Sequence, residues 1–181
     1  LSALEGFDQF YEAFLALTAL YGYHHGATCL TVAEVYPDML AIFPNTVDRR
    51  QWVNACEALA NVSIVASRSG SHTLAAKLES TMRAFADELS RDPSIHPYTA
   101  RVLAKTFMAI GDYQGAIDAA NKIANDAKDH WLLYQQAKAE LALDRLDPAL
   151  ATAMSALKSA EKDPKAKARL SIYHDLLSQC L

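Results

Sequence analysis

A step of 33 residues relates two stretches in the second half of this chain, and this step constrains the fold more than any other feature. The recurring positions are mostly alanines and bulky apolar residues. Ala104, Tyr113, Ala116, Ile117 and Ala120 return as Ala137, Leu146, Ala149, Leu150 and Ala153, and Lys105, Met108 and Ala109 return as Lys138, Leu141 and Ala142. A period of this length is typical of arrays in which each unit is a pair of short helices.

The whole sequence divides into amphipathic segments separated by short breaks at glycine, proline and aspartate. Gly111 follows one segment, as glycine commonly does after a helix, and prolines stand where later segments open. We expect helices at Ser2–Leu20, Thr31–Phe43, Asp48–Ser67, Thr73–Leu89, Pro97–Ile110, Tyr113–Asn125 and Asp129–Leu143, with further helices opening at Asp147–Pro148 and at Asp163–Pro164. No segment indicates a strand, so the sequence predicts an all-α fold.

The second half resembles the tetratricopeptide repeat family over roughly residues 97–175, because its small and bulky residues follow the order of that family's two helices. One unit is filled by Ala100, Leu103, Ala104, Phe107, Gly111, Asp112, Tyr113, Ala116, Ile117 and Ala120, and the next by Leu133, Gln136, Ala137, Glu140, Leu146, Ala149 and Leu150. Leu170, Ser171 and His174 begin a third, less complete unit. The resemblance implies a right-handed stack of antiparallel helical hairpins, a TPR-like α-solenoid.

Four departures from the family pattern leave an unrelated, alanine-rich helical bundle as the alternative. Gln136 and Glu140 replace an expected leucine and an expected aromatic, and the usual proline between the first two units is missing. Lys167 stands where the third unit needs an apolar residue. We expect residues 93–181 to form the repeats with a C-terminal helix, and residues 1–92 to form helical hairpins that are either degenerate repeats or a cap.

Small residues at four positions predict where helices approach each other closely. Ala104 and Ala116 in the first unit correspond to Ala137 and Ala149 in the second. Two helix backbones can come close only where side chains are small, so we expect all four alanines to be buried at helix–helix contacts.

Composition excludes several classes of protein. The formal net charge is −4 and no block of Lys or Arg occurs, which disfavours a nucleic-acid partner. No run of 18 apolar residues predicts a membrane span. The three cysteines are odd in number and form no Cys-x-x-Cys, which favours a reducing, cytoplasmic compartment. The first residues show no signal-peptide pattern and no initiator Met. We expect an excised fragment, from which native targeting signals would be absent.

Catalytic and metal-binding patterns are weak. His24, His25 and Cys29 lack a fourth ligand at a recognised spacing. The Ser69–His72 stretch reads as a turn between helices, and no phosphate loop or nucleophile elbow occurs. We therefore expect no enzyme activity, no cofactor and no metal, and an all-α enzyme using His24, His25 or His72 is the third alternative.

The resemblance also implies a binding surface, because the first helix of each tetratricopeptide unit lines the concave face of the array. It places on that face Tyr98, Arg101, Lys105, Trp131, Tyr134, Gln135, Lys138, Lys165 and Arg169. Cations four residues apart share one helix face, and cations among aromatic rings suit an acidic peptide or a C-terminal carboxylate. The set is similar to the carboxylate clamp of chaperone-binding relatives, although Lys105 and Gln135 replace the asparagines expected there. A solvated basic edge, with Trp131 and Tyr134 packed between helices, is the competing interpretation.

These observations favour a non-enzymatic protein–protein interaction module or scaffold, which binds a partner protein or peptide, preferably acidic, on a helical concave surface. The alternative is a ligand- or peptide-sensing regulatory domain of a larger signalling or transcription protein.

Overall fold

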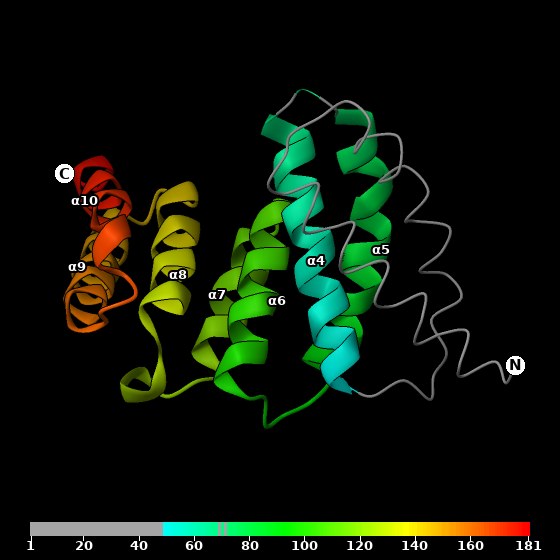
Figure 1. The fold of residues 1–181 in the computed structure, drawn as a ribbon, viewed down its shortest axis with the longest axis horizontal. Helices are drawn as coiled ribbons and strands as arrows, with labels where there is room; N and C mark the ends of the chain where they lie inside the picture. The colour runs from blue at the N-terminus through cyan, green and yellow to red at the C-terminus, as the bar shows by residue number, and fades with distance from the viewer. Residues whose placement is uncertain (1–48, 69, 71) are drawn as a thin grey trace, which may run out of the picture. The chain divides into compact units, whose positions relative to one another are not determined.

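The structure is a computed structural model that describes residues 49–68, 70 and 72–181 (Figure 1). These residues form seven α-helices and two short 3-10 helices, and no strand occurs among them. The predicted all-α class is therefore confirmed for this part of the chain. The helices expected at Ser2–Leu20 and Thr31–Phe43 lie outside the described residues, as do His24, His25 and Cys29.

The chain divides into two compact units, Leu1–Asp87 and Glu88–Leu181. The division lies inside α5 (His72–Ser90), whereas the sequence analysis placed the boundary after residue 92. In the first unit, α4 (Arg49–Arg68) buries a face of small and aliphatic residues. The Trp52 ring meets the Phe85 ring of α5 with their centroids 4.5 Å apart.

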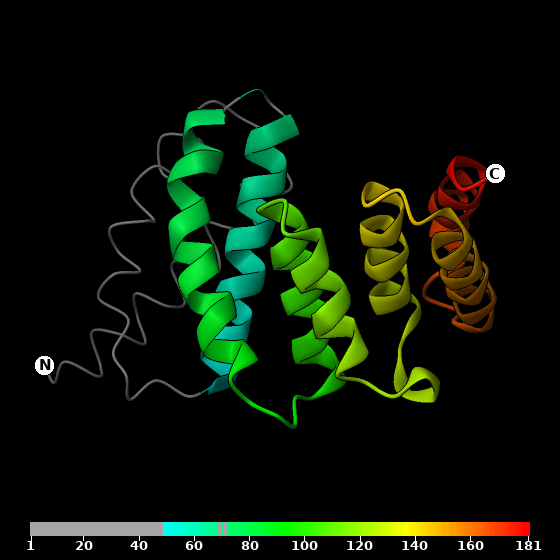
Figure 2. The same cartoon turned by 180° about the vertical axis from the view of Figure 1, so that it is seen from behind.

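The second unit contains five α-helices. They are α6 (Pro97–Ala109), α7 (Tyr113–Asn121), α8 (His130–Ala142), α9 (Leu146–Lys162) and α10 (Leu170–Gln179), with 3-10 helices η1 (Asn125–Ala127) before α8 and η2 (Lys167–Arg169) before α10. Each of these α-helices packs against the next along the chain, and α6 also packs against α8. Figure 2 shows α6 and α7 joined by a tight turn, and α8 and α9 joined in the same way. The helices therefore pack in consecutive pairs, α6–α7 and α8–α9.

Short-range hydrogen bonds explain where these helices begin. His96 precedes α6 and its Nδ1 accepts from the Tyr98 N–H. Asp112 precedes α7, and its carboxylate accepts from the Gly115 N–H at 2.8 Å. Asp129 does the same for α8. Such side chains satisfy N–H groups that a helix N-terminus leaves without partners.

The ends of α6 and α8 have the same backbone geometry, 33 residues apart. Each turn is closed by two backbone bonds: Gly111 N–H to Met108 O and Asp112 N–H to Phe107 O after α6, and Asp144 N–H to Leu141 O and Arg145 N–H to Glu140 O after α8. Gly111 has a φ of 75° and Asp144 a φ of 58°. This pattern is the Schellman motif, in which the residue after the C-cap turns left-handed. The repeat read from the sequence therefore extends to the backbone hydrogen bonds.

The four alanines predicted to lie at helix–helix contacts are in the core. Ala104, Ala116, Ala137 and Ala149 all have no exposed surface. Their predicted burial is confirmed. Around Ala137 and Ala149, the core continues to α10 through Leu176 and Cys180.

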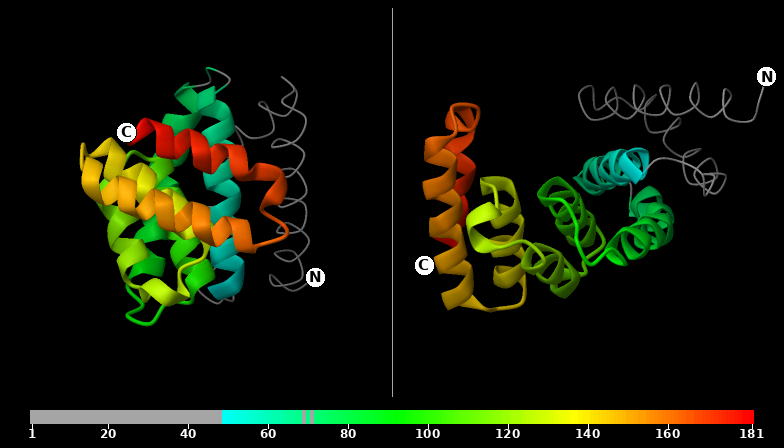
Figure 3. Two further views of the ribbon diagram at one scale, coloured as in Figure 1. Left: turned by 90° about the vertical axis from the view of Figure 1, so that its left-hand side faces the viewer. Right: turned by 90° about the horizontal axis from the view of Figure 1, so that it is seen from below.

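The sequence prediction was wrong about the start of the last helix. We expected it to open at Asp163–Pro164, but α10 begins at Leu170, after a turn and η2. The Asp163 carboxylate accepts from the Lys165 N–H at 2.9 Å, and Asp163 O accepts from the Ala166 N–H. Bonds of an aspartate side chain to nearby backbone compete with helix formation. Figure 3 shows the resulting bend between α9 and α10, which lie side by side.

Smaller differences concern two other helices. The helix expected at Tyr113–Asn125 ends at Asn121 and is followed by η1. The helix expected to open at Asp147–Pro148 begins at Leu146, with Pro148 in its first turn, where a missing N–H costs little.

Candidate binding cavity

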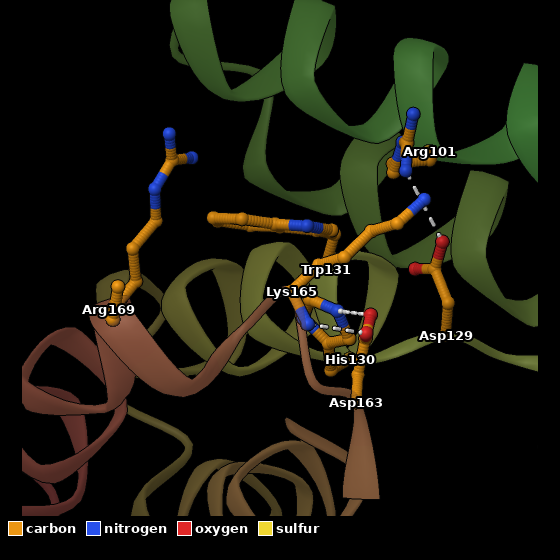
Figure 4. Close-up of a pocket in the computed structure, with 8 residues that line it drawn as sticks. Arg101, Asp129, His130, Trp131, Asp163, Lys165 and Arg169 are labelled. Carbon is orange, nitrogen blue, oxygen red and sulfur yellow. Dashed lines mark hydrogen bonds and ion pairs between the residues drawn. The ribbon is translucent and has the colours of Figure 1, made fainter. Parts of the chain in front are cut away.

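A cavity of about 540 Å³ lies in the second unit, between the N-terminal ends of α6 and α8 and the segment that joins α9 to α10 (Figure 4). It is lined by Arg101, Asp129, His130, Trp131, Asp163, Lys165, Ala168 and Arg169. Four of these, Arg101, Trp131, Lys165 and Arg169, belong to the binding surface expected from the sequence. Asp129, His130 and Asp163 were not expected there, although the start of α8 at Asp129 was predicted.

Arg101 is held on one side of the cavity by a carboxylate and an aromatic ring. Its Nη1 lies 3.3 Å from Asp129 Oδ2, and its Cζ lies 4.8 Å from the centroid of the Tyr98 ring. The other oxygen of Asp129 accepts from the Leu132 N–H at 2.7 Å and caps α8. One carboxylate therefore fixes both the helix start and the guanidinium, so Arg101 is already paired before any ligand arrives.

His130 connects three elements at the base of the cavity. Its Nε2 lies 3.1 Å from Asp163 Oδ2, in the segment after α9, and its Nδ1 lies 2.5 Å from the Tyr173 hydroxyl of α10. His130 and Tyr173 are both buried. Both ring nitrogens therefore have partners, and His130 links α8 to the segment carrying Asp163 and to α10.

The environment determines the charge of the two groups bonded to His130. The Lys165 backbone N–H, followed by the His130 ring, holds the pKa of Asp163 below its usual value. Burial, followed by the nearby Tyr134, raises the pKa of Tyr173. Asp163 is therefore an anion at neutral pH, and Tyr173 keeps its proton.

Trp131 lies in a group of aromatic rings that reaches into the core. Its ring centroid is 5.1 Å from that of His130, 6.0 Å from that of Tyr173 and 6.4 Å from that of Tyr134. The Arg169 Cζ lies 5.7 Å from the Trp131 ring centroid. Trp131 is only partly buried, so the cavity contains an aromatic surface fixed by its neighbours.

Two cations of the cavity, Lys165 and Arg169, have no carboxylate partner within the described part of the chain. Lys165 and Arg169 are exposed, and neither forms an ion pair with any residue that the structure describes. With three cations and two carboxylates around it, the cavity has a net charge of about +1 while His130 is neutral. In the view of Figure 4 the side chains of Lys165 and Arg169 extend toward opposite ends of the Trp131 ring.

Five expected binding residues do not line the cavity. Tyr98 lies against Arg101, and Tyr134 packs against Trp131, so both support residues that line it. Lys138 is exposed, with its Nζ 5.6 Å from the Tyr134 ring centroid. Lys105 and Gln135 are half-buried, outside the lining.

The sequence predicted two pairs of cations on shared helix faces, Arg101 with Lys105 and Lys165 with Arg169. Arg101 lines the cavity but Lys105 does not. Lys165 and Arg169 both line it, but from a turn and from η2 rather than from one helix face. The second pair was therefore predicted from an i, i+4 spacing on one helix, although Lys165 and Arg169 do not lie on one helix.

A second polar cluster lies in the core and includes Lys128, the residue before Asp129. Lys128 Nζ donates to Gln136 Oε1 at 2.9 Å, and Gln136 Nε2 donates to Glu140 Oε1 at 2.8 Å. All three side chains are buried, and Glu140 Oε2 has no hydrogen-bond partner among the residues that the structure describes. Burial lowers the pKa of Lys128, and the charge of Glu140 opposes that shift. Lys128 immediately precedes Asp129, so this network anchors the segment that enters α8.

In the described part of the chain, no three His, Cys, Asp or Glu side chains gather closely enough to hold a metal ion. None of the helices in the same part is long and apolar enough to cross a membrane.

Comparison with known proteins adds no relative. No protein-family model matches the chain, and no curated protein and no solved structure matches it either.

Proposed function

We propose that this chain is a non-enzymatic interaction module of tetratricopeptide-like architecture, and that it binds an acidic segment of a partner protein at the cavity. The observation that carries this proposal concerns Lys165 and Arg169, which lie beside the partly exposed ring of Trp131 and form no ion pair with any described residue. A carboxylate entering the cavity would form charge-assisted hydrogen bonds, which are stronger than neutral ones.

The fixed groups of the cavity favour a bound segment over a mobile counterion. Arg101 is held by Asp129 and Tyr98, and Trp131 is held by the aromatic cluster, so a ligand would not have to order them. Binding to preorganised groups loses less conformational entropy. An acidic segment could place apolar atoms on the indole and carboxylates near the cations.

The tetratricopeptide-like architecture is supported by the correspondence of the two helical pairs. The turns after α6 and α8 share their hydrogen bonds, and α6 packs against α8 as successive first helices of such an array would. The cavity lies at the N-terminal ends of these two helices.

A labelled hexa-aspartate peptide tests the proposal by fluorescence anisotropy. We expect binding that weakens as salt rises, and a loss of about tenfold or more for Arg169→Glu, because reversing one close charge changes a pair interaction by roughly 1–2 kcal/mol at a partly exposed site. Lys165→Glu should act in the same direction.

Lys167→Glu is the matched control. Lys167 belongs to the same 3-10 helix as Arg169, is exposed and does not line the cavity. We expect its effect to stay within about twofold. Equal losses for Lys167→Glu and Arg169→Glu would show that only overall charge matters, and would count against the cavity.

A cavity of about 540 Å³ is also large enough for a small-molecule site, which supports the regulatory alternative. A panel of free mono- and dicarboxylates in a thermal-shift assay separates the two functions. A rise in Tm that Arg169→Glu abolishes, together with no peptide binding, would favour a small anionic ligand.

A further inference from the structure

We propose that the cavity is a proton-linked anion site, in which His130 takes up a proton when an anionic ligand binds. The inference rests on the proposed function, because it concerns the same cavity and the same class of ligand. It adds a regulation, namely that the affinity for the acidic segment depends on pH through one buried imidazole.

The two bonds of His130 allow it to hold an extra proton in place. In the neutral ring, Nε2–H donates to Asp163 and Nδ1 accepts from the Tyr173 hydroxyl. When a proton from solvent adds to Nδ1, the Nδ1–H donates to the Tyr173 oxygen, and the hydroxyl hydrogen turns away. The contact with Asp163 becomes a charge-assisted bond. Both contacts thus persist in both protonation states.

Charged and titratable groups surround this imidazole on every element that packs against it. They are Arg101 from α6, Asp129 and Tyr134 from α8, Asp163, Lys165 and Arg169 from the segment between α9 and α10, and Tyr173 from α10. Among the lining groups, three cations oppose a further positive charge on the imidazole and two carboxylates favour it. A bound ligand adds its own charge to this set.

A bound anion changes this balance. Its carboxylates offset the charges of Lys165 and Arg169, so the imidazolium becomes more favourable when the cavity is occupied. Linkage makes the effect reciprocal, since a proton on His130 must strengthen anion binding by the same factor. Imidazole is the side chain whose charge ordinarily changes between about pH 5 and 8. We therefore expect hexa-aspartate to bind about five- to tenfold more tightly at pH 5.5 than at pH 8. Its own carboxylates stay ionised over that range.

Calorimetric titration of the chain with hexa-aspartate at pH 6.5 tests this. Repeating it in two buffers of different ionisation enthalpy gives the number of protons taken up on binding. We expect a clear fraction of one proton for the wild type and almost none for His130→Gln. The matched control is His174→Gln, because His174 is exposed on α10 and does not line the cavity. It should leave the uptake unchanged.

NMR of the histidine side chains provides a second measurement that needs no variant of His130. The chain has six histidines, and the imidazole signal of His130 should titrate at higher pH in the presence of the peptide than in its absence. Proton uptake that persists in His130→Gln, or a His130 signal that does not move, would overturn the proton linkage while leaving anion binding intact. No binding of hexa-aspartate at any pH would overturn the proposed function, and the linkage with it.

Discussion

The pairs α6–α7 and α8–α9 have the same backbone hydrogen bonds at their turns, but several equivalent buried positions are apolar in the first pair and polar in the second. Three buried positions of the first pair are apolar and their counterparts 33 residues later are polar: Ile95, Leu103 and Phe107 correspond to Lys128, Gln136 and Glu140. All six side chains are buried. The comparison teaches that alanine contacts, caps and turns suffice to define the pairing of helices, and that the remaining core positions are free to vary.

The apolar cluster and the polar network should lose stability in different ways when a residue is replaced. An apolar cluster loses its contribution gradually as atoms are removed, because burial is roughly proportional to area. A buried polar network depends on every member, because a partner left behind is a buried, uncompensated group. In the second pair the network is also connected to the cavity along the chain, since Lys128 directly precedes Asp129 and His130, which line the cavity.

The largest expected effect comes from breaking the polar network at one member. Glu140→Leu should leave the Gln136 amide without its acceptor, and the Lys128 ammonium without the nearby carboxylate charge, in the core. We expect a loss of about 3–5 kcal/mol in the free energy of unfolding, as for a broken buried ion pair. Chemical denaturation monitored by circular dichroism measures it.

The control for that prediction replaces the three polar residues of the second helix pair with the apolar residues found at the equivalent positions of the first. The triple change Lys128→Ile, Gln136→Leu and Glu140→Phe introduces the residues of the equivalent positions. Well-packed apolar replacements of buried charges are often neutral or stabilising, so we expect stability within about 1 kcal/mol of wild type or above it. A triple variant as unstable as Glu140→Leu would refute the equivalence of the two pairs.

Larger side chains at the buried alanines test whether the helices of both pairs pack closely at these positions. Ala104→Leu and Ala137→Leu enlarge equivalent, fully buried positions, and each should lower the free energy of unfolding by about 1–3 kcal/mol. Ala151→Leu, on the exposed face of α9, should have little effect. Thermal melts compare the three variants, and unchanged melting for both buried positions would argue against helix contacts at these alanines.

The left-handed turn residue offers a smaller test. Asp144 adopts the positive φ that Gly111 adopts in the first pair. A side chain in this conformation costs about 1 kcal/mol, so Asp144→Gly should stabilise the chain by up to that amount. Gly111→Ala should destabilise it similarly, through the backbone alone, because no atom lies within 4 Å of the added Cβ. Equal melting temperatures for Asp144→Gly and wild type would contradict the shared turn geometry.

The smallest effect concerns the segment after α9, where the repeat departs from its pattern, and it appears only in acid. The pKa of Asp163 is lowered in the folded chain by the Lys165 backbone N–H and by His130, so this carboxylate stabilises the fold above its unfolded pKa of about 3.9. That contribution is lost as pH falls through the folded pKa. Asp163→Asn should therefore be less stable than wild type at pH 7, and the difference should shrink below about pH 4. A difference that is constant from pH 7 to pH 2 would mean that the carboxylate charge plays no part.

Much of the second unit could be predicted because its signals are local. Gly111 ends α6, Asp129 opens α8 and the four alanines are buried, each as expected. The opening at Asp163–Pro164 resembled another helix start, but the Asp163 side chain bonds Lys165 and His130 instead. Whether an aspartate caps a helix or folds a turn depended here on a histidine 33 residues away.

The candidate site was predicted only in part for the same reason. Arg101, Trp131, Lys165 and Arg169 were identified as cations and an aromatic ring at suggestive spacings. His130 carried no signal, because a lone histidine at a helix start has no pattern that distinguishes it. Its role depends on Asp163 and Tyr173, which are distant in sequence.

The sequence by itself determined the helices, their caps and the 33-residue correspondence, because these follow from hydrogen bonds and side-chain volumes within a few residues of each other. Only the tertiary structure decided which cations share a cavity, that Gln136 and Glu140 form a buried network with Lys128, and that His130 bridges α8, the following segment and α10. Those contacts join residues from separate elements, and a shift of a few ångströms in helix packing creates or removes them.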